Sequence, residues 1–196
     1  MFYSHSAYVA RRLIMHQAYP AQYCHNRIRK KIARWSPRAP AAHVVHIFID
    51  NMRKLSTCCR PAVVSAQFRC VWNGVPTSHR MRQMHSVVAA ACKFGCPSCP
   101  DKIEHYLCCS VVWTWLSKPH PIGLGLDPSL RSCSDMLMLN KRLDQQLVSK
   151  IGIAVYAITR CLHTMKDASG IGTRDVVQML ALQAKEGGRT CKTRLS

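Results

Sequence analysis

The chain has 196 residues, of which 48% are hydrophobic. This is enough to bury a real core in one domain, and it excludes wholesale disorder. Its 28 Lys and Arg side chains against 9 Asp and Glu give a net charge of +19, and residues 1–91 hold only one acid, Asp50. A charge of this size favours a phosphate-backbone partner, RNA or DNA, while a solvated basic surface is the alternative.

Neither an export signal nor a membrane span is evident. The first sixteen residues lack an uninterrupted apolar core and contain Arg11 and Arg12. The longest apolar run, 151–158, is far shorter than the ~20 residues that a span needs. We therefore expect an intracellular protein, nuclear or cytoplasmic and not secreted, with no membrane partner. In a reducing compartment its twelve cysteines are thiols or metal ligands before they are disulfides.

Helical periodicity in the first half predicts three helices. The segment RIRKKIARW at 27–35 places Ile28, Ile32 and Trp35 on one face and cationic side chains on the other. Prolines in the segment 36–40 end this helix and form a linker. A second helix follows over 44–55, although a strand at 42–50 is a less favoured alternative. Pro61 begins the third helix, and Gly74 follows its end.

The second half is also helical in pattern. We expect helices over 103–117, after Asp127 and Pro128, over 147–166 and over 174–186. The helix at 147–166 carries a single apolar stripe of Leu147, Ile151, Val155, Ile158, Leu162 and Met165. The fold class is therefore mainly α, a small helical domain with one Cys/His zinc-finger-like segment. We divide the chain into a basic N-terminal segment and linker (1–40), a helical region with the finger (41–118) and a C-terminal helical region (119–196).

The segment 92–109 holds five cysteines and one histidine. Zinc prefers four tetrahedral sulfur or nitrogen ligands, and the segment offers them in two registers. The wider register is Cys92, Cys96, His105 and Cys109, and the tighter one replaces Cys92 with Cys99. In both, His105 and Cys109 are four residues apart, so that one helix would present them on the same face. Reduced, buried cysteines that act as small hydrophobic residues are the alternative interpretation.

Cationic side chains of the first half are the candidate nucleic-acid contacts. Such side chains on a helix contact phosphates, which carry no base information. We expect little sequence selectivity, and Trp35 more often in the core than stacked on a base. The candidate contacts are Arg27, Arg29, Lys30, Lys31, Arg34, Arg38, Arg80 and Arg82.

The order of these segments resembles the C-terminal region of non-LTR retrotransposon reverse transcriptases, in particular the group known from dinoflagellates and other protists. The resemblance covers about residues 27–116 and rests on two elements. The first is matched by Trp72, Asn73, Gly74, Thr77 and Arg80. The second, a cysteine-histidine finger with an EHY core, is matched by Cys92, Phe94, Gly95, Cys96, Asp101, Glu104, His105, Tyr106 and Cys109. The resemblance implies Cys92, Cys96, His105 and Cys109 as the zinc ligands.

The chain departs from this family most in lacking the polymerase body. A polymerase or nuclease needs clustered carboxylates that hold divalent metals, and the acids here do not cluster in sequence. Asp50 stands alone in its half, and Asp135 and Asp144 are expected to be surface residues. We therefore expect no catalytic residues, no enzymatic activity and no small-molecule substrate.

Two functions remain open from the sequence. The first is a non-catalytic nucleic-acid-binding fragment that resembles the region after the polymerase of a retroelement reverse transcriptase. It would bind RNA or DNA through basic helices and a zinc finger. The alternative is a small basic structural protein with a stabilising metal site, which packs against rRNA or another anionic partner.

Overall fold

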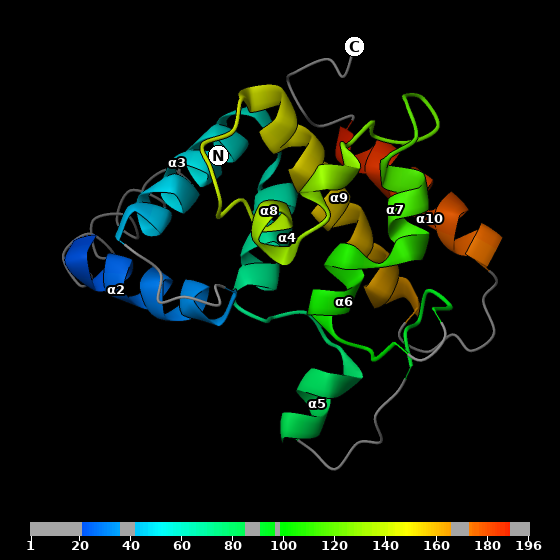
Figure 1. Cartoon of the computed structure of the whole chain (residues 1–196), viewed down its shortest axis with the longest axis horizontal. Coiled ribbons are helices and arrows are strands. Elements are labelled where there is room, and N and C mark those ends of the chain that lie inside the picture. Colours follow the sequence, from blue (N-terminus) through cyan, green and yellow to red (C-terminus); the bar gives the residue numbers. More distant parts are fainter. Residues whose placement is uncertain (1–20, 36–41, 85–90, 97–98, 166–172, 189–196) are drawn as a thin grey trace, which may run out of the picture.

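The computed structural model describes residues 21–35, 42–84, 91–96, 99–165 and 173–188. Within these residues the fold is all-α, as the sequence predicted, and the only β-type pairing is one bridge between Ala91 and Pro100. Figure 1 shows the arrangement. The helices are α2 (Ala21–Ile32), α3 (Ala42–Cys58), α4 (Pro61–Val71), α5 (Ser78–Met84), α6 (Ile103–Cys108), α7 (Ser110–Leu116), α8 (Cys133–Met136), α9 (Gln145–Thr164) and α10 (Thr173–Gly188). Two short 3-10 helices, η1 (Ala33–Trp35) and η2 (Pro128–Leu130), complete them.

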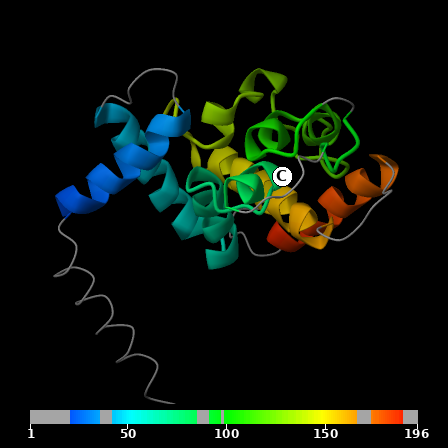
Figure 2. The ribbon, with the colours of Figure 1, turned by 90° about the horizontal axis from the view of Figure 1, so that it is seen from below.

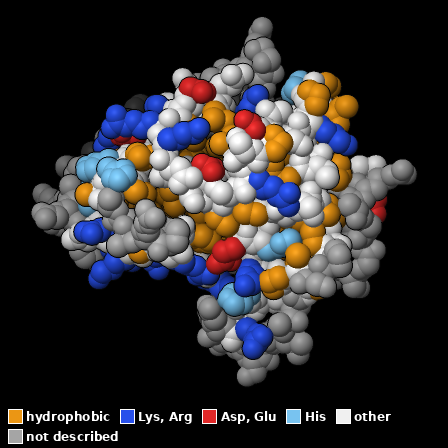
Figure 3. All heavy atoms as spheres, in the orientation of Figure 1, with side chains coloured by type: hydrophobic (Ala, Val, Ile, Leu, Met, Phe, Trp, Pro, Cys, Tyr) orange, Lys and Arg blue, Asp and Glu red, His pale blue; other side chains and the backbone are white. Residues whose placement is uncertain are grey.

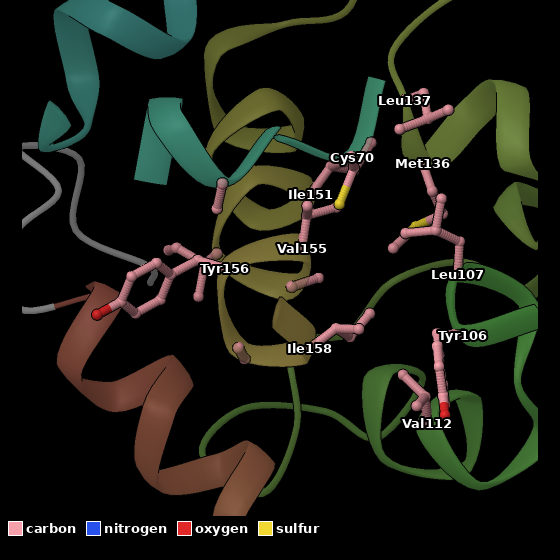
Figure 4. Packing of buried hydrophobic residues seen from close by; sticks show 14 of the residues in the cluster. Cys70, Tyr106, Leu107, Val112, Met136, Leu137, Ile151, Val155, Tyr156 and Ile158 are labelled. Atoms are coloured by element: carbon pink, nitrogen blue, oxygen red, sulfur yellow. The ribbon is translucent and has the colours of Figure 1, made fainter. Parts of the chain in front are cut away.

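Helix α9 is the centre of the molecule, with α2 at one end and α10 at the other (Figures 1 and 2). It packs most closely against α10 and α4, and then against α3. Every residue from Ile151 to Ile158 is buried. Figure 4 shows Ile151 and Val155 beside Cys70 of α4, while Tyr156 points away from them towards α10. The predicted single stripe is therefore incomplete, because a helix that is covered on all sides is apolar around its whole circumference.

One close approach fixes where α9 crosses its neighbours. Gly152 lies where a Cβ atom would come within 2.5 Å of a methyl carbon of Leu55 and 3.2 Å of a methyl carbon of Val63. Leu55 belongs to α3 and Val63 to α4, and both are fully buried. The absence of a side chain at position 152 therefore lets three helices meet.

The predicted amphipathic face of the basic helix is confirmed, although its last turn is the 3-10 helix η1. Ile32 and Trp35 are buried, and the indole nitrogen of Trp35 donates to the carbonyl of Val71 at 2.9 Å. Trp35 thus has a core role. The predicted linker at 36–40 lies outside the described residues. The strand alternative at 42–50 is wrong, because α3 covers this segment.

Two local predictions need correction, and one detail after α4 was not predicted. The helix expected over 103–117 is two helices, because Cys109 has an extended backbone (φ −60°, ψ 130°) between α6 and α7. Asp127 caps a 3-10 turn, and its side chain accepts from the backbone N–H of Ser129. After α4, the left-handed conformation is taken by Asn73 (φ 52°), one residue before Gly74. Asparagine tolerates this region better than most residues.

Candidate metal centre

Four side chains of the wider register come together in the structure. The ligand atoms of Cys92, Cys96, His105 and Cys109 all lie within 4.8 Å of one another. The Sγ atoms of Cys96 and Cys109 are 3.2 Å apart. The three cysteines are buried, and His105 is half-buried. This group can hold a metal ion, since three sulfur atoms and one imidazole nitrogen make a complete tetrahedral donor set.

A tight turn presents the first two cysteines. The backbone N–H of Gly95 donates to the carbonyl of Cys92 at 3.1 Å, and that of Phe94 points to the Sγ of Cys92 at 3.4 Å. Gly95 has φ 84°, a left-handed conformation that glycine adopts without strain. The N–H of Cys92 donates to the carbonyl of Cys99 at 2.7 Å. The turn is therefore closed by backbone hydrogen bonds, and it fixes the Cys92 sulfur beside Cys96.

The second pair of ligands comes from α6 and its end. His105 lies on α6, and Cys109 is the residue between α6 and α7. The expectation that one helix carries both is thus only partly met. The break turns the chain at Cys109 and brings its sulfur to the group. Beyond it, the hydroxyl of Ser110 lies 3.5 Å from the Sγ of Cys96.

The half-buried His105 has one feature that itself indicates a ligand. Its Nε2 atom is buried and has no hydrogen-bond partner. Leaving such an atom unpaired costs about 1–3 kcal/mol, so that native structures rarely do so without a reason. A metal ion bound through Nε2 would supply the missing partner.

The thiols of Cys92 and Cys109 have different pKa values. A hydrogen bond from the Cys109 thiol stabilises the thiolate of Cys92, and this lowers the pKa of Cys92 from 9.0 to about 5, against the opposing effect of burial. Backbone N–H groups of Cys96 and Phe94 add to the effect. The same contact raises the pKa of Cys109. The lowered pKa favours the thiolate form of Cys92, which is the form that binds a metal.

A buried hydrogen-bond network supports the ligands from behind. The hydroxyl of Tyr106, next to His105, donates to Asp101 Oδ1 at 2.6 Å and accepts from the N–H of Lys93 at 3.1 Å. The other oxygen of Asp101 accepts from the N–H of Ser78 at 2.6 Å. Phe94 packs edge-on against the Tyr106 ring, with ring centroids 4.9 Å apart. Asp101 and Tyr106 thus join the ligand turn to α6 and to the start of α5.

Sequence patterns did not assign these two supporting roles. The family resemblance includes Asp101 and Tyr106 among its matched residues but gives them no role. The signal that could have found Asp101 is its burial, since it is 2% exposed. Burial of a carboxylate requires hydrogen-bond partners, but it cannot be seen from a single sequence.

Cys99, the alternative ligand, is not a member of the group of four. Its backbone carbonyl accepts a hydrogen bond from the N–H of Cys92, and this is how Cys99 contacts the turn. Cys99 is half-buried. The structure therefore favours the wider register, which has Cys92 in place of Cys99, as the candidate metal group.

The predicted nucleic-acid contacts occupy two places. Arg27, Arg29, Lys30 and Lys31 are exposed on α2, and Lys and Arg side chains gather over this helix in Figure 3. Arg34, in η1, pairs with Glu104 of α6 at 2.8 Å. Arg80 and Arg82 lie on the separate helix α5. Arg38 lies outside the described residues.

The carboxylates of Asp50, Asp135 and Asp144 form ion pairs or hydrogen bonds within the fold. Asp50 pairs with Arg53 and Arg142, at 3.6 and 3.0 Å. The carboxylate of Asp144 accepts from the backbone N–H of Leu147 at the start of α9. That of Asp135 accepts from the Ser132 hydroxyl and the Asn140 amide.

Neither models of known protein families, nor curated protein sequences, nor solved structures gave a match to this chain. Among the described residues, no helix has both the length and the apolar character that crossing a bilayer requires.

Proposed function

We propose that this chain is a non-catalytic nucleic-acid-binding module that contains a structural zinc site. Zinc is the metal that suits a closed set of three thiolates and one imidazole, because it favours four soft or borderline ligands in a tetrahedron. The four ligands leave no open position for a substrate. The role of the ion is then to stabilise the fold of segment 91–109.

One observation supports the nucleic-acid role above the others. Helix α2 buries Ile32 and continues into the buried Trp35, while Arg29, Lys30 and Lys31 on the same helix are exposed. No acid occurs in α2 or η1. A helix anchored on one side and cationic on the other can approach phosphates without rearrangement. The partner is RNA or DNA, held largely through its backbone.

A salt titration of binding tests this role. Changing Arg29, Lys30 and Lys31 together to Gln removes three cations that face solvent and leaves the buried face intact. Each phosphate contact on duplex DNA contributes about 0.9 to the slope of log affinity against log salt. We expect the slope to fall by roughly two to three units, with similar weakening for every sequence.

The matched control changes Lys118, Lys141 and Lys185 to Gln. These three side chains are also exposed and lie outside α2, so that the loss of net charge is the same. We expect the control to keep most of the parent slope. If both variants lower the slope equally, net charge rather than α2 determines binding. An unchanged slope in the α2 variant would remove the main support for the proposal.

We further propose that the module derives from the region after the polymerase of a non-LTR retroelement reverse transcriptase. The support is the order of a basic helix, the Trp72–Gly74 element and the Cys/His finger. Sequencing the genomic DNA upstream of the Met1 codon tests this derivation. A continuous frame that encodes polymerase motifs with paired aspartates supports it, and an in-frame stop codon immediately upstream contradicts it.

A further inference from the structure

Two cysteines outside the metal group face each other across the surface of the finger. Cys108 is the last residue of α6, and Cys133 is the first residue of α8. Their Sγ atoms are 3.7 Å apart. Both residues are half-buried, so that a small reagent can reach them from solvent. Neither belongs to the group of Cys92, Cys96, His105 and Cys109.

The two chain segments are held together by more than the sulfur contact. The guanidinium Nε of Arg131 donates to the carbonyl of Cys108 at 2.8 Å. The thiol of Cys133 points to the carbonyl of Glu104 at 3.4 Å. Helices α6 and α8 are in direct contact. The pair is therefore positioned by its surroundings, and its two members come from segments 25 residues apart.

Other close sulfur pairs in the described residues differ in kind. Cys96 and Cys109 are 3.2 Å apart inside the metal group, where a bound ion would occupy both. Cys58 and Cys59, at 3.8 Å, are buried neighbours in the chain. Cys108 and Cys133 are instead partly exposed and are not needed as ligands.

We infer that Cys108 and Cys133 form a reversible disulfide, a redox modification site beside the metal centre. A disulfide bond is about 2.05 Å long, so the sulfur atoms must approach by roughly 1.7 Å. The oxidant is a small disulfide such as oxidised glutathione, which reacts by thiol–disulfide exchange.

The exchange has two balanced steps. The sulfur of one cysteine attacks the oxidised glutathione, its S–S bond breaks, and one glutathione leaves as a thiol. The second cysteine then attacks the mixed disulfide, and the other glutathione leaves as a thiol. Two protein thiols are oxidised to one disulfide, and one glutathione disulfide is reduced to two thiols, which receive the two protons.

The position of the Cys108–Cys133 disulfide determines how it would affect metal binding. Cys108 directly precedes the ligand Cys109, and α6 also carries His105. The disulfide would tie the last turn of α6 to α8 without consuming a ligand. We therefore expect oxidation to leave the metal content of the protein unchanged.

Peptide mapping of the full zinc-loaded chain tests this inference. The protein is equilibrated in glutathione buffers of increasing oxidised fraction, its free thiols are alkylated, and it is digested with trypsin. Cleavage after Lys102 and Arg131 places Cys108 and Cys133 in different peptides, 103–131 and 132–141. We expect these two peptides to become linked, with a loss of two hydrogen atoms, while zinc per chain stays constant.

Variants assign the bond to its atoms. Because peptide 103–131 also contains Cys109, Cys108→Ser must abolish the link if the assignment is right, and Cys133→Ser must do the same. Cys99→Ser is the matched control, a half-buried cysteine of the same region, and it must keep the link. Differential alkylation of the unmodified chain gives the same information without a variant, in case either substitution prevents folding.

Three outcomes would overturn the inference. The first is the absence of any link between these peptides in the most oxidising buffer. The second is a link that survives in Cys108→Ser. The third is a link that forms only after zinc is lost, because the pair would then belong to a disrupted finger rather than to the folded protein.

Discussion

The guanidinium of Arg34 lies 2.8 Å from the Oε1 atom of Glu104, and so joins the end of the basic helix to the helix that carries His105. The two residues are 70 positions apart in the chain. Both side chains are about one-third exposed (36% and 35%). The second oxygen of Glu104 is buried and has no hydrogen-bond partner. The ion pair therefore connects the helix proposed to bind nucleic acid with the helix that carries a proposed zinc ligand.

We predict a modest coupling energy for this ion pair. A double-mutant cycle of Arg34→Gln and Glu104→Gln, measured by urea unfolding, should give a coupling energy of about 0.2–1 kcal/mol, since solvent screens a partly exposed pair. Arg34→Gln should cost more than Glu104→Gln, because it leaves a partly buried carboxylate without its cation. Equal costs with no coupling would show that the contact contributes nothing to stability.

Ligand identity is tested by two matched serine variants. Cys92→Ser should weaken zinc binding by more than the ~10–100-fold that loss of an outer-shell partner costs, because it removes a ligand. Cys99→Ser should bind zinc as the parent does, since its sulfur is outside the group of four. Competition with a chromophoric chelator measures both. The reverse ranking would establish the tighter register.

Removal of the metal should unfold the finger locally. Structural zinc contributes its binding free energy directly to folding. A chelator should therefore increase amide hydrogen exchange in 91–109, while α9, which is buried throughout Ile151–Ile158, stays protected. Unchanged exchange in 91–109 after verified zinc removal would contradict a structural role for the ion.

Tyr106→Phe should weaken zinc binding about 10-fold or more without removing a ligand. The hydroxyl donates to Asp101 and accepts from the N–H of Lys93, and its loss leaves a buried carboxylate oxygen and a half-buried N–H without this partner, at about 1–3 kcal/mol. Tyr156→Phe is the control, because it removes a tyrosine hydroxyl on α9 instead. Equal zinc affinities in the two variants would show that the network does not support the ligands.

Gly152→Ala should destabilise the protein by about 1–2 kcal/mol. The new methyl group would overlap a buried methyl group of Leu55 at 2.5 Å, and overpacking of this kind costs about 1–3 kcal/mol. The better helix propensity of alanine offsets up to ~1 kcal/mol. Gln146→Ala, on an exposed position of the same helix, should change stability by less than about 0.5 kcal/mol. A rise in melting temperature for Gly152→Ala would mean that the crossing is looser than described.

Stability should fall in alkali because of Cys161. Burial raises the pKa of this thiol from 9.0 to about 12, although Arg160 opposes the shift. Between these values the unfolded chain loses the proton and the folded chain keeps it, so that stability declines as pH rises above 9. The decline is about 1.4 kcal/mol for each pH unit. Urea unfolding between pH 8 and 10.5 should show a shallower decline for Cys161→Ala, and parallel curves would contradict the assignment.

Local sequence patterns alone predicted most of the longer helices and restricted the candidate metal ligands to two sets. The period of the apolar residues indicated α2, α3 and α9, because burial of one helix face needs only residues that follow one another in the chain. The spacing of Cys92, Cys96, His105 and Cys109 restricted the metal group to two registers. Pro61 marked the first residue of α4 for an equally local reason, since its missing N–H has no partner there in any helix.

The tertiary structure decided what depends on contacts between distant segments. Several features require neighbours that local periodicity does not identify. They are the break at Cys109, the burial of α9 on every side and the support of the candidate ligands by Asp101 and Tyr106. The pairings of Arg34 with Glu104 and of Cys108 with Cys133 belong to the same class. Periodicity predicts that a face is buried but not which residues cover it. Hydrogen bonds, ion pairs and sulfur contacts exist only once the chain has brought both partners together.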